Sequence, residues 1–197
     1  MSGFSLIHPP VAVVYDLEFT AWEGSMANHW LRPGEFKEIV QIGAVKVDEG
    51  FNSGETFDAM VRPRLNPVLS PYLERLTGIN NQEVRARGVD FMQAYREFVT
   101  FCGGLPIVAF GRDDLVFLDN LRLYGITDAP PVPSYVNVTI WMAEQGFDMR
   151  GLHACDVSAA AGVPFEGRKH NALDDALSVA SGIRALMARG APSPLAR

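Results

Sequence analysis

The sequence lacks the features that mark several large classes of protein. Its two cysteines, Cys102 and Cys155, lie far apart and belong to no CxxC or Cys/His cluster, which argues against a disulfide framework and against a zinc site. No apolar run approaches the roughly 20 residues that a membrane span needs, and no basic segment followed by a long apolar run begins the chain. We therefore expect a cytoplasmic protein without a membrane partner.

Signature motifs of other chemistries are also missing, and basic residues are in the minority. The sequence has no GxxxxGK[ST] phosphate loop and no GxGxxG, GxSxG or HExxH motif. Its 17 Lys and Arg residues against 23 Asp and Glu residues give a net charge of -6, which is unfavourable for binding phosphate backbones. Two divalent cations held by four carboxylates would add four positive charges and leave -2. Net charge alone therefore does not exclude a nucleic-acid substrate.

Length and hydrophobic patterning predict one α/β domain over residues 1–197, with a core at about 10–188. Runs rich in β-branched and aromatic residues predict strands at 11–15, 38–47, 57–61, 106–110 and 135–140. Helical spacing occurs at 69–76, 90–101, 114–124, 151–161 and 172–188, and residues 20–36 show no period and are expected to form a functional loop. This order predicts a mixed sheet, a three-strand meander plus parallel strands, flanked by helices.

A pair of carboxylates closes the first predicted strand. Asp16 and Glu18 are two residues apart, so the period of a strand places both side chains on one face. Such a pair is costly unless solvent or a cation screens it, and D-x-E at a strand end is therefore a candidate site for a divalent metal. Taken alone, an exposed strand terminus explains the pattern as well.

The segment FGRDDLVFLDNLRLYG carries two more carboxylates directly after a buried strand. Helical rotation places Asp114 on the face of Leu118 and Leu121, while Asp113 precedes the helix and suits an N-cap. An inward carboxylate needs a metal or hydrogen bonds, so Asp114 is the predicted ligand of the two. A hydrogen-bonded buried aspartate is the alternative.

The segment GRKHNALDDALSVA places a histidine and two aspartates at the start of the last helix. The apolar stripe through Ala172, Ala176 and Val179 puts Asp175 at its edge and Asp174 on the solvated side. Five residues before Asp175, His170 would stand near the same metals with a pKa suited to accepting a proton from water. A purely structural histidine is the alternative.

In this order, the segments YDLEFT, FGRDDLVFL and HNALDDA resemble the three motifs of the DEDDh 3′–5′ exonucleases, the DnaQ-like members of the ribonuclease H-like superfamily. The resemblance covers nearly the whole chain. Further segments, EIVQIGAV, MVRPRLNPVLS, LTGI and GLHACDVSAAAGVPFEGRKH, are similar to the exoribonuclease subgroup of KapD-type bacterial proteins and eukaryotic trimmers of small RNAs and histone-message ends. Phe110 and Arg112 depart from the residues expected around the second motif, which bears on substrate preference.

The resemblance implies a ribonuclease H-like sheet and a site for two metal ions, Mg²⁺ with Mn²⁺ as a substitute. In that site Asp16 would bridge both ions, Glu18 and Asp175 would complete one coordination shell, Asp114 would hold the other ion, and His170 would deprotonate the attacking water. The pocket for the terminal nucleotide would be formed by Leu17, Phe19, Leu76, Thr77, Gly78 and Ile79. A helix end followed by a glycine turn explains LTGI equally well.

The sequence therefore predicts a 3′–5′ exonuclease that releases nucleoside 5′-monophosphates from single-stranded RNA or short oligonucleotides, with RNA preferred over DNA as partner. A DNA-directed exonuclease shares the chemistry. A catalytically silent binding module of the same fold would have lost a ligand, and all five reaction residues are present. The resemblance allows a homodimer, for which the sequence holds no assembly signal.

Overall fold

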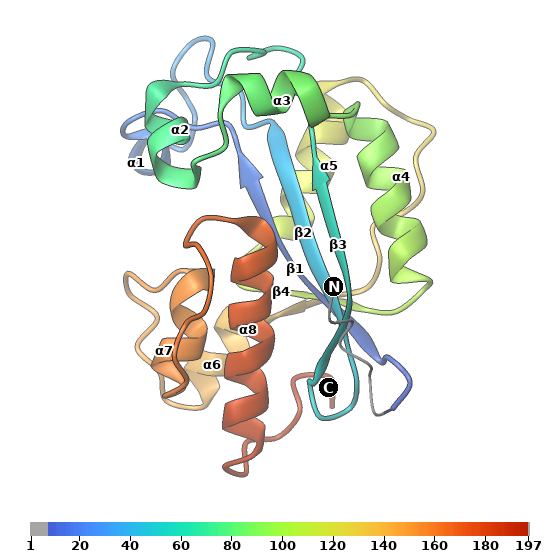
Figure 1. Cartoon of the computed structure of the whole chain (residues 1–197), viewed down its shortest axis with the longest axis vertical. Helices are drawn as coiled ribbons and strands as arrows, with labels where there is room; N and C mark the ends of the chain where they lie inside the picture. The colour runs from blue at the N-terminus through green and yellow to red at the C-terminus, as the bar shows by residue number, and fades with distance from the viewer. Residues whose placement is uncertain (1–7, 197) are drawn as a thin grey trace.

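Five strands form one mixed sheet in the computed structural model, which describes residues 8–196. They are β1 (Ala12–Phe19), β2 (Ile39–Val47), β3 (Ser53–Met60), β4 (Ile107–Ala109) and β5 (Tyr135–Asn137). The spatial order is β3-β2-β1-β4-β5, with β2 antiparallel to both of its neighbours, β1 and β3, and with β4 and β5 parallel to β1 (Figure 1). This topology confirms the predicted meander with parallel strands beside it.

Helices cover both faces of the sheet and one of its ends (Figure 1). On one face lie α6 (Val138–Glu144), the short 3₁₀ helix η1 (Ala154–Asp156), α7 (Val157–Ala160) and α8 (Ala172–Met187). The other face is covered by α4 (Phe91–Cys102) and α5 (Asp113–Leu123), and the short helices α1 (Ser25–Asn28), α2 (Pro71–Thr77) and α3 (Asn81–Arg87) lie beyond one end. Within residues 8–196, no helix is long and apolar enough to cross a bilayer.

Strand β1 divides the core because its side chains alternate between the two faces. Val14 packs into the cluster under α8, whereas Val13 and Tyr15 pack into the cluster under α4 and α5, and all three are fully buried. The same alternation sends Asp16 and Glu18 to the face of Val14. The two carboxylates of β1 therefore face the side of the sheet that α8 covers.

Several elements differ from the prediction. The expected strand over 135–140 ends at Asn137, because the Asn137 side chain accepts a hydrogen bond from the Thr139 amide (2.9 Å) and so begins α6. The prediction omitted α3, which Asn80 caps in the same way through the Glu83 amide (2.9 Å). Residues 151–161 form only η1 and α7, and the expected loop over 20–36 contains the single turn α1.

Helix α8 approaches β2 so closely that its N-terminal turn is fixed against the strand. A Cβ atom on Gly43 would lie 2.0 Å from the Leu173 amide nitrogen, so only glycine fits there. Beside it, the Gln41 side chain accepts a hydrogen bond from the Ala172 amide (3.1 Å) and donates one to Asp58 (2.9 Å). Because Gly43 pairs with Asp16 and Gln41 with Glu18 across the β1/β2 ladder, these contacts set the start of α8 opposite the two carboxylates.

Candidate active site

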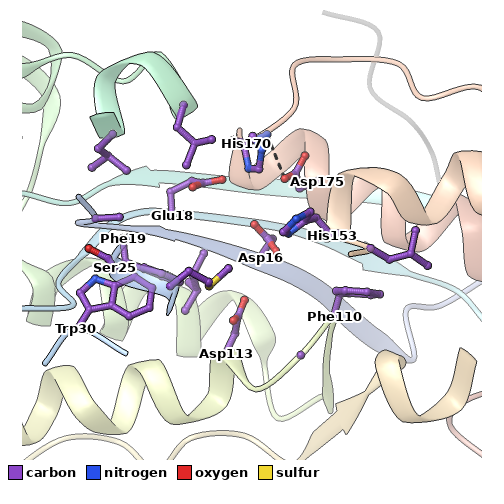
Figure 2. Close-up of a pocket in the computed structure, with 18 of the residues that line it drawn as sticks. Asp16, Glu18, Phe19, Ser25, Trp30, Phe110, Asp113, His153, His170 and Asp175 are labelled. Carbon is purple, nitrogen blue, oxygen red and sulfur yellow. Dashed lines mark hydrogen bonds between the residues drawn. The ribbon is translucent and has the colours of Figure 1, made fainter. Parts of the chain in front are cut away.

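The carboxylates of Asp16 and Glu18 stand at the carboxyl end of β1, where the sheet meets the first turn of α8 (Figure 2). Each residue is only 8% exposed. The D-x-E pattern therefore places two acidic groups together in a largely desolvated position. An arrangement of this kind is unfavourable in a protein unless another charge compensates it.

The start of α8 brings an aspartate and a histidine to the same place. Asn171 caps the helix by accepting a hydrogen bond from the Asp174 amide (3.2 Å), and Asp175 lies in the first turn, 3% exposed. Its Oδ2 atom accepts a hydrogen bond from the backbone amide of His170 (3.2 Å), a residue held in the left-handed region at φ 60°. Figure 2 shows both side chains facing Glu18.

From the second motif, the structure brings Asp113 to this site in place of the predicted Asp114. Asp113 lines the pocket and interacts electrostatically with Asp16 and Glu18 (Figure 2). Asp114 lies outside the pocket lining and accepts two hydrogen bonds, each of 2.8 Å, from the Arg112 guanidinium. Asp113 is the first residue of α5 and not its N-cap, which is Arg112.

The physical reason for this difference from the sequence prediction is a polar residue on the buried face of α5. Besides Asp114 itself, the buried positions of that helix are Val116, Phe117 and Asn120, which lie three, four and seven residues after Asp113. Asn120 is fully buried because its side chain accepts a hydrogen bond from the Ile39 amide (3.0 Å) and donates to two backbone carbonyls. An apolar stripe cannot reveal a face that contains an asparagine.

Burial, and after it repulsion from nearby carboxylates, raises the pKa values of the four acidic groups that we call the carboxylate cluster: Asp16, Glu18, Asp113 and Asp175. Desolvation raises the pKa of Glu18 to about 8, with Asp175 and Asp113 adding repulsion. Desolvation likewise raises the pKa of Asp175 to about 7 and that of Asp113 to about 7, although Lys37 partly offsets the latter. The pKa of Asp16 is raised most by burial and then by its acidic neighbours. The cluster thus requires positive charge to ionise fully at neutral pH.

The donor set fits divalent cations. Glu18, His170 and Asp175 each offer one ligand atom, and these atoms lie within 4.8 Å of one another. In addition, the Oδ1 atom of Asp175 is buried without a hydrogen-bond partner among the residues that the structure describes. A buried carboxylate oxygen left unpaired is costly, and oxygen ligands with at most one imidazole suit Mg²⁺ and Mn²⁺.

His170 lies at the mouth of this cluster with a second imidazole beside it. The rings of His170 and His153 are 6.0 Å apart between centroids, nearly perpendicular. Burial lowers the pKa of His170, the charges of His153 and Lys169 lower it further, and Asp156 acts in the opposite direction. These influences favour the neutral imidazole, the form that can accept a proton.

Carboxylates also hold the segment that carries His170. Asp174 accepts a hydrogen bond from the Arg168 amide (2.7 Å), and Asp156 pairs with Lys169 (2.7 Å) and accepts one from the His153 amide (3.2 Å). The segment before α8 is therefore tied to α8 itself and to η1.

The carboxylate cluster, His153 and His170 line one pocket of about 610 Å³. Of the residues predicted to bind the terminal nucleotide, Leu17, Phe19 and Leu76 line it. Thr77, Gly78 and Ile79 do not: Thr77 and Ile79 are buried, and the Thr77 hydroxyl bonds to the Leu73 carbonyl (2.9 Å) and the Ile79 amide (3.0 Å). Gly78 is the left-handed C-cap of α2. These three residues build the turn that follows Leu76.

Sequence reasoning missed part of the pocket lining. Trp22, Met26 and Trp30 come from the segment between β1 and β2, and His153 comes from the segment before η1. The aromatic content of residues 20–36 was the available signal, but without a period it assigns no direction to any side chain.

Comparison with known proteins agrees with this arrangement. The family model RNase_T, described as Exonuclease, matches residues 13–181, and a search of curated proteins finds no match. The fold is similar to the nuclease domain of 3′hExo, a DEDDh family member bound to rAMP, with a TM-score of 0.77 and 21% identity over 95% of this chain and 96% of that one. It is also similar to cell-death related nuclease 4 (CRN-4), with a TM-score of 0.74 and 21% identity over 91% and 64%.

A third solved structure is E. coli Exonuclease I in complex with a dA16 oligonucleotide. Its TM-score is 0.66, with 16% identity over 91% of this chain and 41% of that one. At such low sequence identities these matches show a similar fold and nothing more, and that fold confirms the predicted ribonuclease H-like architecture.

Proposed function

This chain belongs to the exonuclease family, and from that premise we propose that it hydrolyses phosphodiester bonds at the 3′ end of single-stranded RNA and releases nucleoside 5′-monophosphates. The observation that carries the proposal is the carboxylate cluster with His170 in one pocket. Phosphodiester hydrolysis assisted by two metal ions needs several carboxylates converging on one place, with a proton acceptor beside them.

The roles follow from the positions of the side chains. Asp16, Glu18, Asp113 and Asp175 would hold the cations, with Asp113 in the role that the sequence assigned to Asp114. When bound, two divalent ions supply Lewis-acid polarisation of the phosphate and stabilise charge on the leaving oxygen. The neutral imidazole of His170 accepts the proton of the attacking water. The hydrogen bond from the His170 amide to Asp175 fixes this base relative to the cluster.

The terminal nucleoside would lie against Leu17, Phe19 and Leu76, whose apolar side chains line the pocket next to Glu18. Thr77, Gly78 and Ile79 act indirectly, by holding the turn that presents Leu76. Two solved neighbours support RNA over DNA: one is described as recognising a histone mRNA stem-loop and the other is bound to rAMP, each with a TM-score of 0.77. The neighbours bound to single-stranded DNA have lower scores. Membership of the RNA-trimming subgroup that includes KapD-type proteins is part of this proposal.

The decisive experiment is digestion of matched 5′-labelled single-stranded RNA and DNA oligonucleotides with Mg²⁺ or Mn²⁺. We expect a ladder that shortens from the 3′ end, faster on RNA, and that disappears with chelator and in Asp16→Asn and His170→Ala. Arg189→Gln, a surface change remote from the pocket lining, is the control and should match the wild type.

Each other outcome selects a different function. Faster shortening of DNA would replace RNA by DNA as the substrate. No shortening of either strand with either metal, by a protein that is folded, would refute the enzyme and favour a binding module of the same fold.

A further inference from the structure

A contact beside the pocket joins the segment that carries His170 to the C-terminal end of α2. A Cβ atom on Gly78 would lie 1.4 Å from one terminal nitrogen of the Arg168 guanidinium and 1.8 Å from its central carbon. The guanidinium therefore fills the space that any side chain at position 78 would need. In Figure 1 the segment that enters α8 lies below α2, in agreement with this contact.

We propose that Arg168 is a positioning residue for the general base, and that it acts by packing its guanidinium on Gly78. Leu76, two residues before this glycine, lines the side of the pocket proposed for the terminal nucleoside. His170, two residues after Arg168, lines the same pocket beside the carboxylates. The contact therefore sets the distance between the bound nucleoside and the base that activates water. This inference rests on the proposed exonuclease function.

The backbone of the segment before α8 is anchored on the opposite side from α2. A Cβ atom on Gly167 would lie 2.6 Å from the carboxylate carbon of Asp174, and the Arg168 amide donates a hydrogen bond to the same carboxylate (2.7 Å). The Lys169 ammonium pairs with Asp156, the last residue of η1 (2.7 Å). These contacts tie the segment to α8 and η1. The Arg168 side chain extends the other way, to α2.

Gly78 is a fixed partner for the guanidinium. It caps α2 in the left-handed region at φ 70°, and its amide donates a hydrogen bond to the Glu74 carbonyl (2.9 Å). The neighbouring Thr77 is buried, with its hydroxyl hydrogen-bonded on both sides within the same turn. A backbone without a Cβ atom offers a planar guanidinium a surface on which to pack. Loss of the contact should therefore displace the segment that carries His170 and leave α2 in place.

The contact depends on packing, because the guanidinium has no acidic partner. In the described part of the chain, the Arg168 side chain forms no ion pair and no hydrogen bond, whereas the guanidinium of Arg112 is held by Asp114. The shape of the group can therefore be separated from its charge. A lysine at this position keeps the charge but lacks the plane.

A double-mutant cycle with the base tests whether Arg168 acts through His170. With excess enzyme and 5′-labelled RNA, Arg168→Ala should lower the cleavage rate by about 10- to 100-fold, the effect of displacing a catalytic group by about 1 Å. In the His170→Ala background no base remains to be positioned, so the same substitution should change the residual rate by less than about twofold. An equal loss in both backgrounds would refute the proposal.

Arg75→Ala is the matched control for this cycle. It removes the same charge from an exposed position in the last turn of α2, outside the pocket lining. The control should keep the wild-type rate. A loss in Arg75→Ala as large as in Arg168→Ala would mean that positive charge near α2, and not the contact with Gly78, supports the reaction.

Gly78→Ala tests the contact from its other side. The added methyl group must displace the guanidinium, which can move aside because it ends a flexible side chain, so the rate should fall as in Arg168→Ala. Combined with Arg168→Ala, it should cause no further loss of rate. Gly125→Ala is the control for backbone strain, because Gly125 has φ 65° and a Cβ atom there would meet no atom of the described chain within 4 Å. It should lower stability and keep the rate.

Arg168→Lys decides between shape and charge. We expect it to be as slow as Arg168→Ala, because its ammonium cannot pack flat on Gly78. A wild-type rate in Arg168→Lys would refute the packing contact and assign Arg168 to a substrate phosphate. A wild-type rate in Gly78→Ala would refute the contact as well.

Amide hydrogen exchange in metal-free protein supplies a readout that does not depend on turnover. The amides of Arg168, His170 and Asn171 are each hydrogen-bonded, and Arg168→Ala should speed their exchange by about fivefold or more, whereas Arg75→Ala should not. Faster exchange in a protein that cleaves neither RNA nor DNA would refute the proposed function and support the contact. Unchanged exchange in a protein that cleaves RNA would refute the contact alone.

Discussion

Exchanging Asp113 and Asp114 for asparagine, one at a time, tests the placement of the second motif. The two substitutions are chemically identical and occupy adjacent positions, so each is the control for the other. We expect Asp113→Asn to lower kcat/KM on RNA by at least about 100-fold, because losing one metal ligand removes about 3 kcal/mol of transition-state stabilisation. Asp114→Asn should stay within about threefold, since its carboxylate pairs with Arg112, whose side chain is 56% exposed.

The effects of these two variants on stability should be opposite to their effects on activity: Asp113→Asn should be more stable than wild type, and Asp114→Asn slightly less stable. The folded-state pKa of Asp113 is raised to about 7, so in metal-free protein at pH 8 its ionised carboxylate opposes folding. A pKa difference of about three between the folded and unfolded states corresponds to about 4 kcal/mol of folding free energy. Solvent in the pocket and the loss of the Lys37 interaction reduce the expected gain in stability of Asp113→Asn to about 1–2 kcal/mol. Unfolding should therefore occur about 3–6 °C higher than in wild type at pH 8, and by a smaller margin at pH 5, which lies closer to the unfolded-state pKa of about 4.

The assay combines initial rates on 5′-labelled RNA with thermal unfolding in chelator at the two pH values. Asp114→Asn should unfold slightly below wild type at both, because the ion pair that it loses with Arg112 outweighs the repulsion of Asp113 that it relieves. Loss of activity in Asp114→Asn with retention in Asp113→Asn would refute the assignment outright. A destabilised Asp113→Asn at pH 8 would refute the electrostatic account of the cluster.

Three further predictions concern the cluster, the base and the scaffold. The folded-state pKa is about 8 for Glu18 and about 7 for Asp175, so ionisation of these groups opposes folding increasingly from about pH 4 to pH 8. Mn²⁺ should therefore raise the unfolding temperature of metal-free protein much more at pH 8 than at pH 5. Equal shifts at the two pH values would contradict this. His153→Gln should move the acid limb of the kcat–pH profile to higher pH, because the charge of His153 lowers the pKa of His170, the proposed base. An acid limb at the wild-type position would count against an interaction between the two histidines. Glu38→Gln should lower the free energy of unfolding, measured by urea titration, by about 3 kcal/mol. The reason is that this fully buried carboxylate accepts hydrogen bonds from three backbone amides and from the Tyr124 hydroxyl. A change below about 1 kcal/mol would show that these bonds are dispensable.

The strand and the last helix of the site were predictable because their patterns are strong. The period of two in β1 gives Asp16 and Glu18 a common face without knowledge of the rest of the fold. In α8, the apolar stripe through Ala172, Ala176 and Val179 gives the rotation that separates Asp175 from Asp174. Both predictions depend only on local geometry.

The remaining parts of the site depend on contacts between distant segments. The buried Asn120 satisfies its side chain on the backbone of Ile39 and Lys37, about 80 positions earlier, and so hides the inward face of α5. The segment that brings Trp22, Met26 and Trp30 to the pocket takes its shape from hydrogen bonds such as that of Ser25 to Glu35, which no periodicity can reveal. Propensity and pattern indicated which segments matter, and tertiary hydrogen bonds decided which atoms face the pocket.

The distribution of the cluster along the chain has a consequence for its synthesis. Asp16 and Glu18 are translated well before His170 and Asp175, which belong to the segment that enters and begins α8, and that helix continues to Met187. A ribosome releases the chain from its N-terminus, so the carboxylates of β1 emerge long before the partners that complete the site. A nascent or prematurely terminated chain that lacks α8 therefore has no assembled active site.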